Sequence, residues 1–123
     1  MCILDIYNND IYPNNKFTRK RVDINIPLKS KTDGNEYLTK LQAGLDKIES
    51  GFKLAFVVAG TDVLESDPLG GLGLSIRDCV ARDGLILEKL KALSIPAVFL
   101  GGGGYGRESA TAMTESISAH YRM

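Results

Sequence analysis

The 123-residue sequence has no excess of charge of either sign, because 15 Lys and Arg residues balance 15 Asp and Glu residues. A balanced charge does not attract a polyanion, which argues against nucleic acid as a partner. No stretch approaches the roughly 20 apolar residues that cross a bilayer, and the first residues, MCILDIYNND, lack the basic start and long apolar segment of a signal peptide. We therefore expect a cytoplasmic protein that binds neither nucleic acid nor membrane.

Histidine and cysteine are also scarce, and this limits the chemistry that the chain can perform. The single histidine, His120, falls in the last turn of the final predicted helix, where a C-terminal cation or a surface residue is the ordinary interpretation. A self-sufficient Ser-His-Asp site or a His-rich zinc site therefore has no histidine in the loops. Cys2 and Cys79 lack the spacing of a zinc site or a redox pair, so we expect both to be reduced, buried thiols.

The hydrophobic pattern predicts one domain over residues 1–123, built from alternating strands and helices. The predicted strands are 2–7, 22–26, 54–59 and 97–100, and the predicted helices are 36–50, 75–94 and a last one with Ala110, Met113, Ile117 and Tyr121 on one face. Pro27 is expected to end the second strand, and the continuously apolar LAFVVA run predicts a strand buried on both faces. This alternation predicts a parallel sheet covered by helices.

One predicted loop is too long for an ordinary connection between a strand and a helix. Residues 60–74 separate the third strand from the second helix, where 2 to 6 residues are typical. Their apolar content predicts an ordered and functional loop. Asp62, just past the buried strand, can ligate a metal, act as a base or cap a turn, whereas Asp67 before Pro68 is typical of turn chemistry.

The fourth strand leads into four consecutive glycines and a tyrosine. Gly101 to Gly104 permit positive φ values and a close approach of the backbone to a bound group. A phosphate cradle is conceivable, but the Lys and Ser of a P-loop are absent. Tyr105 has two interpretations: its ring closes the core, as is common near a strand end, or its hydroxyl points into the crevice beyond the strands.

Two segments carry a specific family resemblance. GTDVLESDPLGGLGLS followed by FLGGGGYG resembles the C-terminal part of the zinc-dependent histone deacetylase and acetylpolyamine amidohydrolase superfamily. INIPLKSKTDGNEYL and ILDIYNNDIYP extend the similarity over roughly residues 2–119, and the class IV branch is the most similar. The resemblance implies an α/β fold with a three-layer, arginase/deacetylase-like parallel sheet, helices on both faces, and a chain that forms a C-terminal partial domain.

The resemblance also implies roles for particular residues. Asp62 matches the third zinc ligand of the family, and Tyr105 matches the catalytic tyrosine that donates a hydrogen bond to the acyl carbonyl. Leu69 matches an apolar residue of the acyl-lysine channel, and Gly103 and Gly104 match the loop beside it. The implied cofactor is Zn²⁺, and the implied substrate is an acylated lysine or polyamine. Both side-chain types suit the chemistry, since a carboxylate helps to hold zinc and a phenol supplies a donor where negative charge develops.

The sequence departs from the family in lacking the Asp-x-His motif, which holds the other two zinc ligands, and the pair of adjacent histidines. One aspartate cannot hold zinc tightly, so we expect weak or absent zinc binding and no activity in this chain alone. Two hypotheses follow: a zinc-dependent deacetylase domain that needs an N-terminal part, or a non-catalytic module for assembly. Because a sheet cut through its middle exposes apolar surface, we expect self-association or pairing with the missing part.

Overall fold

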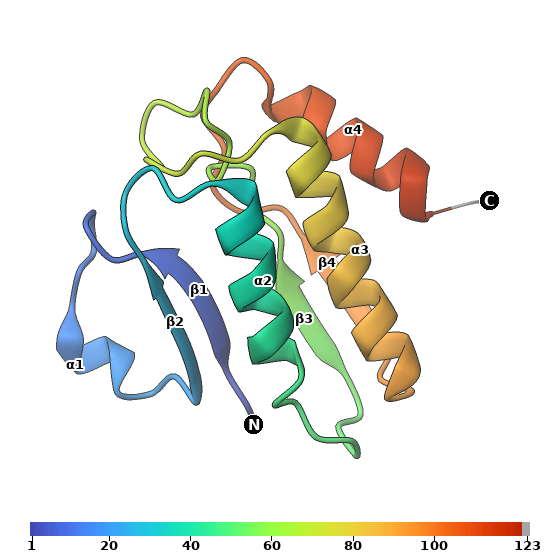
Figure 1. The fold of residues 1–123 in the computed structure, drawn as a ribbon. Coiled ribbons are helices and arrows are strands. Elements are labelled where there is room, and N and C mark those ends of the chain that lie inside the picture. The colour runs from blue at the N-terminus through green and yellow to red at the C-terminus, as the bar shows by residue number, and fades with distance from the viewer. Residues whose placement is uncertain (122–123) are drawn as a thin grey trace.

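A computed structural model of the chain describes residues 1–121, and it confirms the prediction of an α/β fold with parallel strands (Figure 1). The elements, in chain order, are β1 (Leu4–Asn8), α1 (Lys16–Arg19), β2 (Ile24–Leu28), α2 (Gly34–Leu45), β3 (Ala55–Val58), α3 (Ile76–Ala92), β4 (Ala97–Leu100) and α4 (Ser109–His120). Only the short helix α1 is absent from the elements that the sequence predicts. Within residues 1–121, no helix is both long enough and apolar enough to span a membrane.

The four strands form two parallel pairs, β1 with β2 and β3 with β4. In the first pair Leu4 lies opposite Ile24, and in the second Ala55 lies opposite Ala97. The expectation that Pro27 ends its strand is wrong, because Pro27 lies inside β2 opposite Tyr7. Proline is tolerated there because β2 pairs only with β1 among the described residues, so the missing N–H costs no ladder hydrogen bond.

Helix α2 supplies much of the hydrophobic core. Asp33 caps its start, since the Asp33 side chain accepts a hydrogen bond from the Glu36 N–H. The spacing of four residues places Tyr37, Leu41 and Leu45 on one buried face. The core cluster gathers these side chains with others from β2, the long loop, α3 and α4: Leu28, Val63, Leu64, Leu72, Leu74, Cys79 and Ala112.

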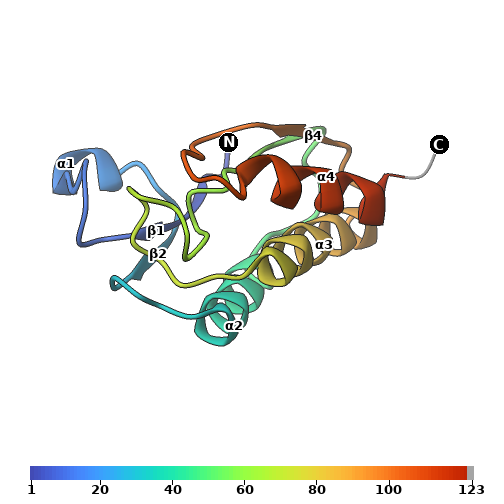
Figure 2. The same ribbon diagram turned by 90° about the horizontal axis from the view of Figure 1, so that it is seen from above.

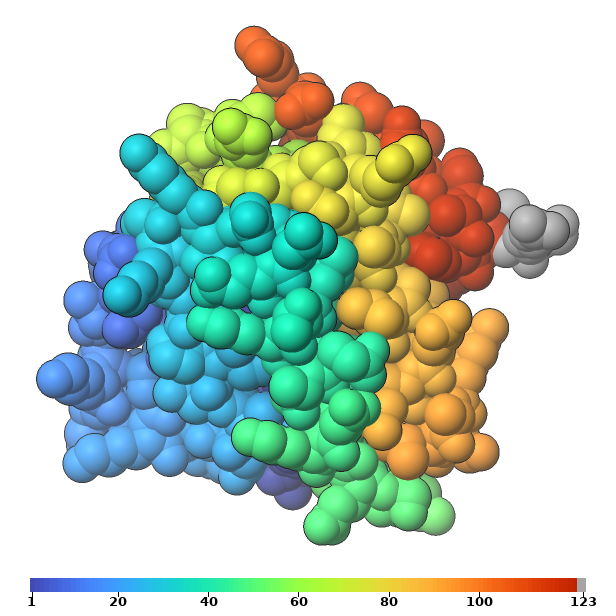
Figure 3. Space-filling view, viewed as in Figure 1, coloured from blue at the N-terminus to red at the C-terminus, as the bar shows by residue number. Residues whose placement is uncertain are grey.

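Helix α3 begins with the capping box that Ser75 and Asp78 predict. The Ser75 hydroxyl accepts from the Asp78 N–H, and the Asp78 carboxylate accepts from the Ser75 N–H. Helices α2 and α3 lie side by side on the same side of the strands (Figures 1 and 2). In the space-filling view their side chains form a continuous surface over the strands (Figure 3). The two helices therefore cover one face of the strands.

The opposite face differs between the two pairs of strands. On β1, Arg19 of α1 pairs with Asp5 and stacks on the Tyr7 ring, so a short helix covers that face. On β3, Phe56 and Val58 are 67 % and 69 % exposed. The prediction that LAFVVA is buried on both faces is therefore wrong for this chain, because no described element lies on the second face of β3 and β4.

Two further apolar predictions need correction. Met113 and Ile117, on the predicted apolar face of the last helix, are exposed, and α4 instead buries Ala112 and Ser116 against the rest of the domain. Cys79 is a buried thiol as predicted, but Cys2 is exposed because it precedes the first strand. Both errors arise because an apolar residue type shows only that burial is favourable, whereas burial itself needs a neighbouring element.

Candidate functional site

The long loop after β3 is ordered and is attached to the ends of the other strands. Asn8, the last residue of β1, donates a side-chain hydrogen bond to the Gly70 carbonyl at 3.0 Å. Beyond β2, the Lys31 N–H donates to the Gly71 carbonyl at 2.6 Å. Since ligands of parallel α/β proteins bind beyond the carboxyl ends of the strands, residues 60–74 lie where a site is expected.

A second loop, which follows β4, joins the first one. The Thr61 and Asp62 N–H groups donate to the Gly103 carbonyl at 2.7 and 3.2 Å. The Thr61 and Ser109 hydroxyls form a hydrogen bond of 2.6 Å, which connects the first loop to the start of α4. Part of the second loop projects from the top of the molecule in Figure 3. The two motifs that the sequence singled out therefore form one continuous structure.

The glycines of the second loop are required by this close approach. A β-carbon on Gly103 would lie 2.5 Å from the Asp62 Oδ2 atom, and one on Gly104 would overlap the Thr61 hydroxyl. The expected positive φ values are not found: among residues 1–121, the glycines with positive φ are Gly51 and Gly71. Gly102, Gly103 and Gly104 therefore serve for close contact with β3 and the first loop, and not for left-handed backbone.

Asp62 and Tyr105 both lie next to Gly103. The β-carbon that Gly103 lacks would contact both the Asp62 carboxylate and the Tyr105 Cε2 atom, at 2.5 and 3.5 Å. Tyr105 is 63 % exposed, so the interpretation in which its ring closes the core is wrong. Its side chain instead remains accessible next to a half-buried carboxylate. A carboxylate and a phenol hydroxyl, from two different loops, are therefore brought close together there.

The Asp62 carboxyl is in an environment that disfavours its negative charge. Burial raises the pKa of Asp62, and the nearby Asp67 carboxylate raises this pKa further, while the Asp62 backbone N–H and the Arg82 charge oppose the rise. No side-chain donor among the described residues forms a hydrogen bond with the Asp62 carboxylate. A bound cation would stabilise the ionised form, so Asp62 fits the role of a metal ligand.

Asp67 forms the turn that the sequence predicts and makes a further contact that it does not predict. Its Oδ1 atom accepts from the N–H groups of Leu69 and Gly70, each at 2.8 Å. Its Oδ2 atom accepts from the Tyr105 N–H at 2.8 Å. The Asp-Pro pair was a signal for the first contact, whereas the second joins residues 38 positions apart and left no local pattern.

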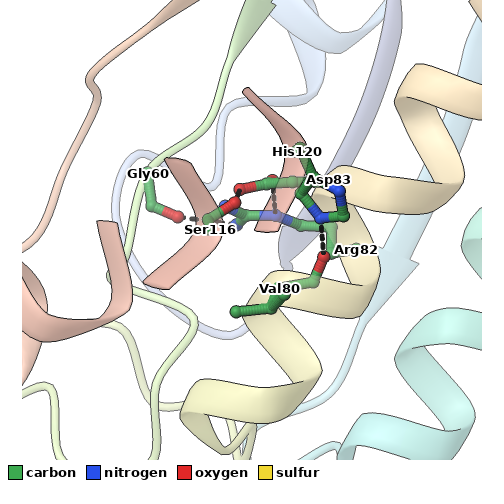
Figure 4. A network of polar contacts seen from close by, with 6 residues as sticks. All are labelled: Gly60, Val80, Arg82, Asp83, Ser116 and His120. Atoms are coloured by element: carbon green, nitrogen blue, oxygen red, sulfur yellow. Dashed lines mark hydrogen bonds and ion pairs between the residues drawn. The ribbon is translucent and has the colours of Figure 1, made fainter. Parts of the chain in front are cut away.

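A buried ion pair between Arg82 and Asp83 holds the start of the first loop, and sequence reasoning missed it. Arg82 Nε donates to Asp83 at 2.9 Å, and Arg82 Nη1 donates to the Gly60 carbonyl at 2.6 Å, two residues before Asp62 (Figure 4). The Ser116 hydroxyl of α4 donates to Asp83 at 2.5 Å. The network therefore links α3, α4 and the start of the loop that carries Asp62. Adjacent opposite charges in the middle of an amphipathic helix were the available signal.

The remaining predicted residues lie as follows. Leu69 is 63 % exposed, next to the Asp67 turn, where its side chain is available for a ligand. His120 is in the last turn of α4, as predicted, but it is half-buried, with Nε2 2.9 Å from the Val80 carbonyl (Figure 4). His120 is therefore at the opposite end of α4 from Tyr105, which precedes the start of this helix. Within residues 1–121, no three His, Cys, Asp or Glu side chains gather to hold a metal.

Fold and site together define an α/β protein whose candidate active site lies at the carboxyl ends of parallel strands. Residues 1–121 match the histone deacetylase domain family, and the chain belongs to that family. Histone deacetylase 2 of Arabidopsis thaliana is 38 % identical over 117 residues, which are 94 % of this chain and 30 % of the relative. The family resemblance of the two loop motifs is thus confirmed.

Solved structures show the same fold at low sequence identity. An acetylpolyamine aminohydrolase from Burkholderia pseudomallei superposes with a TM-score of 0.75 at 20 % identity, over 96 % of this chain and 36 % of that protein. The HD domain of HDA15 superposes with a TM-score of 0.70 at 18 % identity, over 94 % of this chain and 35 % of that domain. The prediction of a partial arginase/deacetylase-like fold is confirmed, and the chain spans about a third of these relatives.

Proposed function

We propose that the chain forms the C-terminal part of the active site of a zinc-dependent amide hydrolase, which removes an acyl group from a lysine or a polyamine. The observation that carries the proposal is the meeting of Asp62 and Tyr105 at Gly103, beyond the ends of β3 and β4. Membership of the histone deacetylase family supports the reaction type. The surroundings of Asp62 and of Tyr105 each suit a particular role in this reaction.

Asp62 would contribute one ligand to the metal. Its carboxylate is half-buried and close to the Asp67 carboxylate, so a cation relieves an unfavourable charge there. Zinc in catalytic sites takes three protein ligands, and the other two would come from outside this chain. When bound, Zn²⁺ supplies a Lewis acid that polarises the acyl carbonyl and makes water a stronger nucleophile.

Tyr105 would donate its phenolic proton in a hydrogen bond to the acyl carbonyl oxygen as negative charge develops on that oxygen. The side chain is exposed, and no described residue forms a hydrogen bond with its hydroxyl, so the donor is available to a substrate. The Tyr105 backbone is held by Asp67, which fixes where the side chain starts. Leu69, Gly103 and Gly104 would line the channel that receives the acyl-bearing side chain.

The second face of β3 and β4 is where the rest of the domain would pack. Phe56 and Val58 of β3 lie opposite Val98 and Leu100 of β4, so the four exposed apolar side chains share one face. The relatives are about three times as long as this chain, which provides enough protein to cover that face. We therefore take the N-terminal part of a deacetylase domain as its occupant.

Completion of the domain tests the proposal. The chain would be joined to the N-terminal part of a related histone deacetylase domain, and zinc content and hydrolysis of acetyl-lysine peptides and acetylpolyamines would be measured. We expect stoichiometric zinc and turnover in the completed protein, and neither in the 123-residue chain. A completed protein that folds and holds zinc but hydrolyses no acyl amide would favour the non-catalytic assembly module instead.

A further inference from the structure

Asp67 uses both oxygens of its carboxylate to hold backbone of the two site loops. The residue is 7 % exposed, and each of its three hydrogen bonds is 2.8 Å long. Oδ1 holds the N–H groups of Leu69 and Gly70 within its own loop, whereas Oδ2 holds the N–H of Tyr105 in the other loop. A turn needs only the first oxygen, so the second one requires a separate explanation.

The contact at Tyr105 is one of two that fix the short segment from Gly103 to Tyr105. At one end, the Gly103 carbonyl accepts from the N–H groups of Thr61 and Asp62. At the other end, the Tyr105 N–H donates to Asp67, and a β-carbon on Gly106 would lie 3.3 Å from the Asp67 Cα atom. The Tyr105 ring is largely exposed, so its position depends on this backbone attachment more than on core packing.

We infer that Asp67 is a positioning residue that sets the distance between the Tyr105 hydroxyl and the metal ligand Asp62, an inference that rests on the proposed function. The attachment at Gly103 holds the segment next to Asp62, and the attachment at Tyr105 prevents rotation of the segment about that point. Asp67 thus acts through Tyr105 and needs no contact with the substrate. A displacement of about 1 Å at a reacting group can cost on the order of 10²-fold in rate.

The variant Asp67→Asn distinguishes the contacts of Oδ1 from the contact of Oδ2, because it replaces one of the two oxygens by an NH₂ group. Its amide oxygen can still accept from Leu69 and Gly70, but its NH₂ group then faces the Tyr105 N–H, donor against donor. In the 123-residue chain, amide hydrogen exchange by NMR should show a loss of protection at Tyr105, with protection kept at Leu69 and Gly70. An amide turned the other way would lose two protected groups instead of one, which makes that arrangement less favourable.

Activity of the completed domain supplies the second measurement. Asp67→Asn should lower kcat by about 10- to 100-fold while the zinc content stays unchanged. The same substitution added to Tyr105→Phe should lower kcat little further, because the hydroxyl that Asp67 positions is already absent. Glu65→Gln is the matched control, since Glu65 is an exposed carboxylate of the same loop, and it should leave kcat unchanged.

Two results would overturn the inference. One is a Tyr105 amide that stays protected in Asp67→Asn, and the other is a full additional loss of kcat when Asp67→Asn is added to Tyr105→Phe. Failure of the proposed function is distinct, because it appears either as a completed domain that folds and holds zinc but has no turnover, or as full turnover in Tyr105→Phe alone. The exchange measurement needs neither zinc nor turnover, so it tests the attachment of Tyr105 even in that case.

Discussion

The carboxylate of Asp62 lies against the Cα atom of Gly103, so closely that a β-carbon there would be 2.5 Å from Oδ2. Gly103→Ala should therefore displace the carboxylate and weaken zinc binding in the completed domain by about 10- to 100-fold. Gly101→Ala is the matched control, because a β-carbon on Gly101 has nothing within 4 Å. Equal zinc affinities of the two variants in a competition titration would contradict the importance of this contact.

The Ser116 hydroxyl should stabilise the chain through the buried Arg82–Asp83 pair. Ser116→Ala leaves one oxygen of the Asp83 carboxylate without its donor, which should lower the free energy of unfolding by about 1–3 kcal/mol. Ser118→Ala, an exposed site in the same helix, corrects for the better helix propensity of alanine. Urea titrations of the two variants should differ by that amount, and coincident curves would show that the network contributes little.

The two cysteines should react very differently with an alkylating reagent. Burial raises the pKa of Cys79 to about 11, so its thiol stays protonated at neutral pH, whereas Cys2 is exposed. Mass spectrometry after iodoacetamide treatment at pH 8 should show one adduct on the folded chain and two after denaturation. Rapid labelling of Cys79 in the folded chain would contradict its burial.

The same shift predicts how stability depends on pH. The folded state holds the Cys79 proton more tightly than the unfolded state does, so this contribution to stability is fully present at neutral pH. It should be lost as the pH rises from the ordinary thiol pKa through about 11. Cys79→Ala should abolish this component of the alkaline destabilisation in thermal melts, and an unchanged pH dependence would assign it to other groups.

Without the rest of a domain, the exposed face of β3 and β4 should make the isolated chain self-associate. Phe56→Ser removes a large apolar side chain from that face and should shift the chain toward monomer in light scattering. Phe17→Ser serves as the control, because Phe17 is also exposed but belongs to α1, next to the other pair of strands. A wild-type chain that is monomeric at high concentration would contradict the prediction that this exposed apolar face drives self-association.

Local patterns were sufficient to predict much of this structure. The spacing of Tyr37, Leu41 and Leu45 predicted α2, and Ser75 with Asp78 predicted the cap of α3. Both depend on residues within one or two turns of each other. The order of strands and helices along the chain predicted parallel pairing, because two strands joined through a helix in a βαβ unit pair in parallel.

Features that depend on distant parts of the chain were not predictable in this way. The bond from Tyr105 to Asp67 and the network of Arg82 with Ser116 join separate elements, and no local spacing encodes them. The exposure of Phe56 was missed because an apolar strand looks the same whether or not a partner covers it. Asp62 and Tyr105 were identified through family resemblance, while spacing alone left metal binding, base chemistry and turn formation open for Asp62.

Zinc content measured together with turnover in the completed domain tests most directly whether Asp62 and Tyr105 have the roles proposed for them. Asp62→Ala should lose zinc, since it removes a charged ligand. Tyr105→Phe should keep zinc and the fold but lower kcat by about 10²- to 10³-fold, the usual loss for one oxyanion donor. Full turnover in Tyr105→Phe, or stoichiometric zinc in Asp62→Ala, would contradict the assignment of these residues.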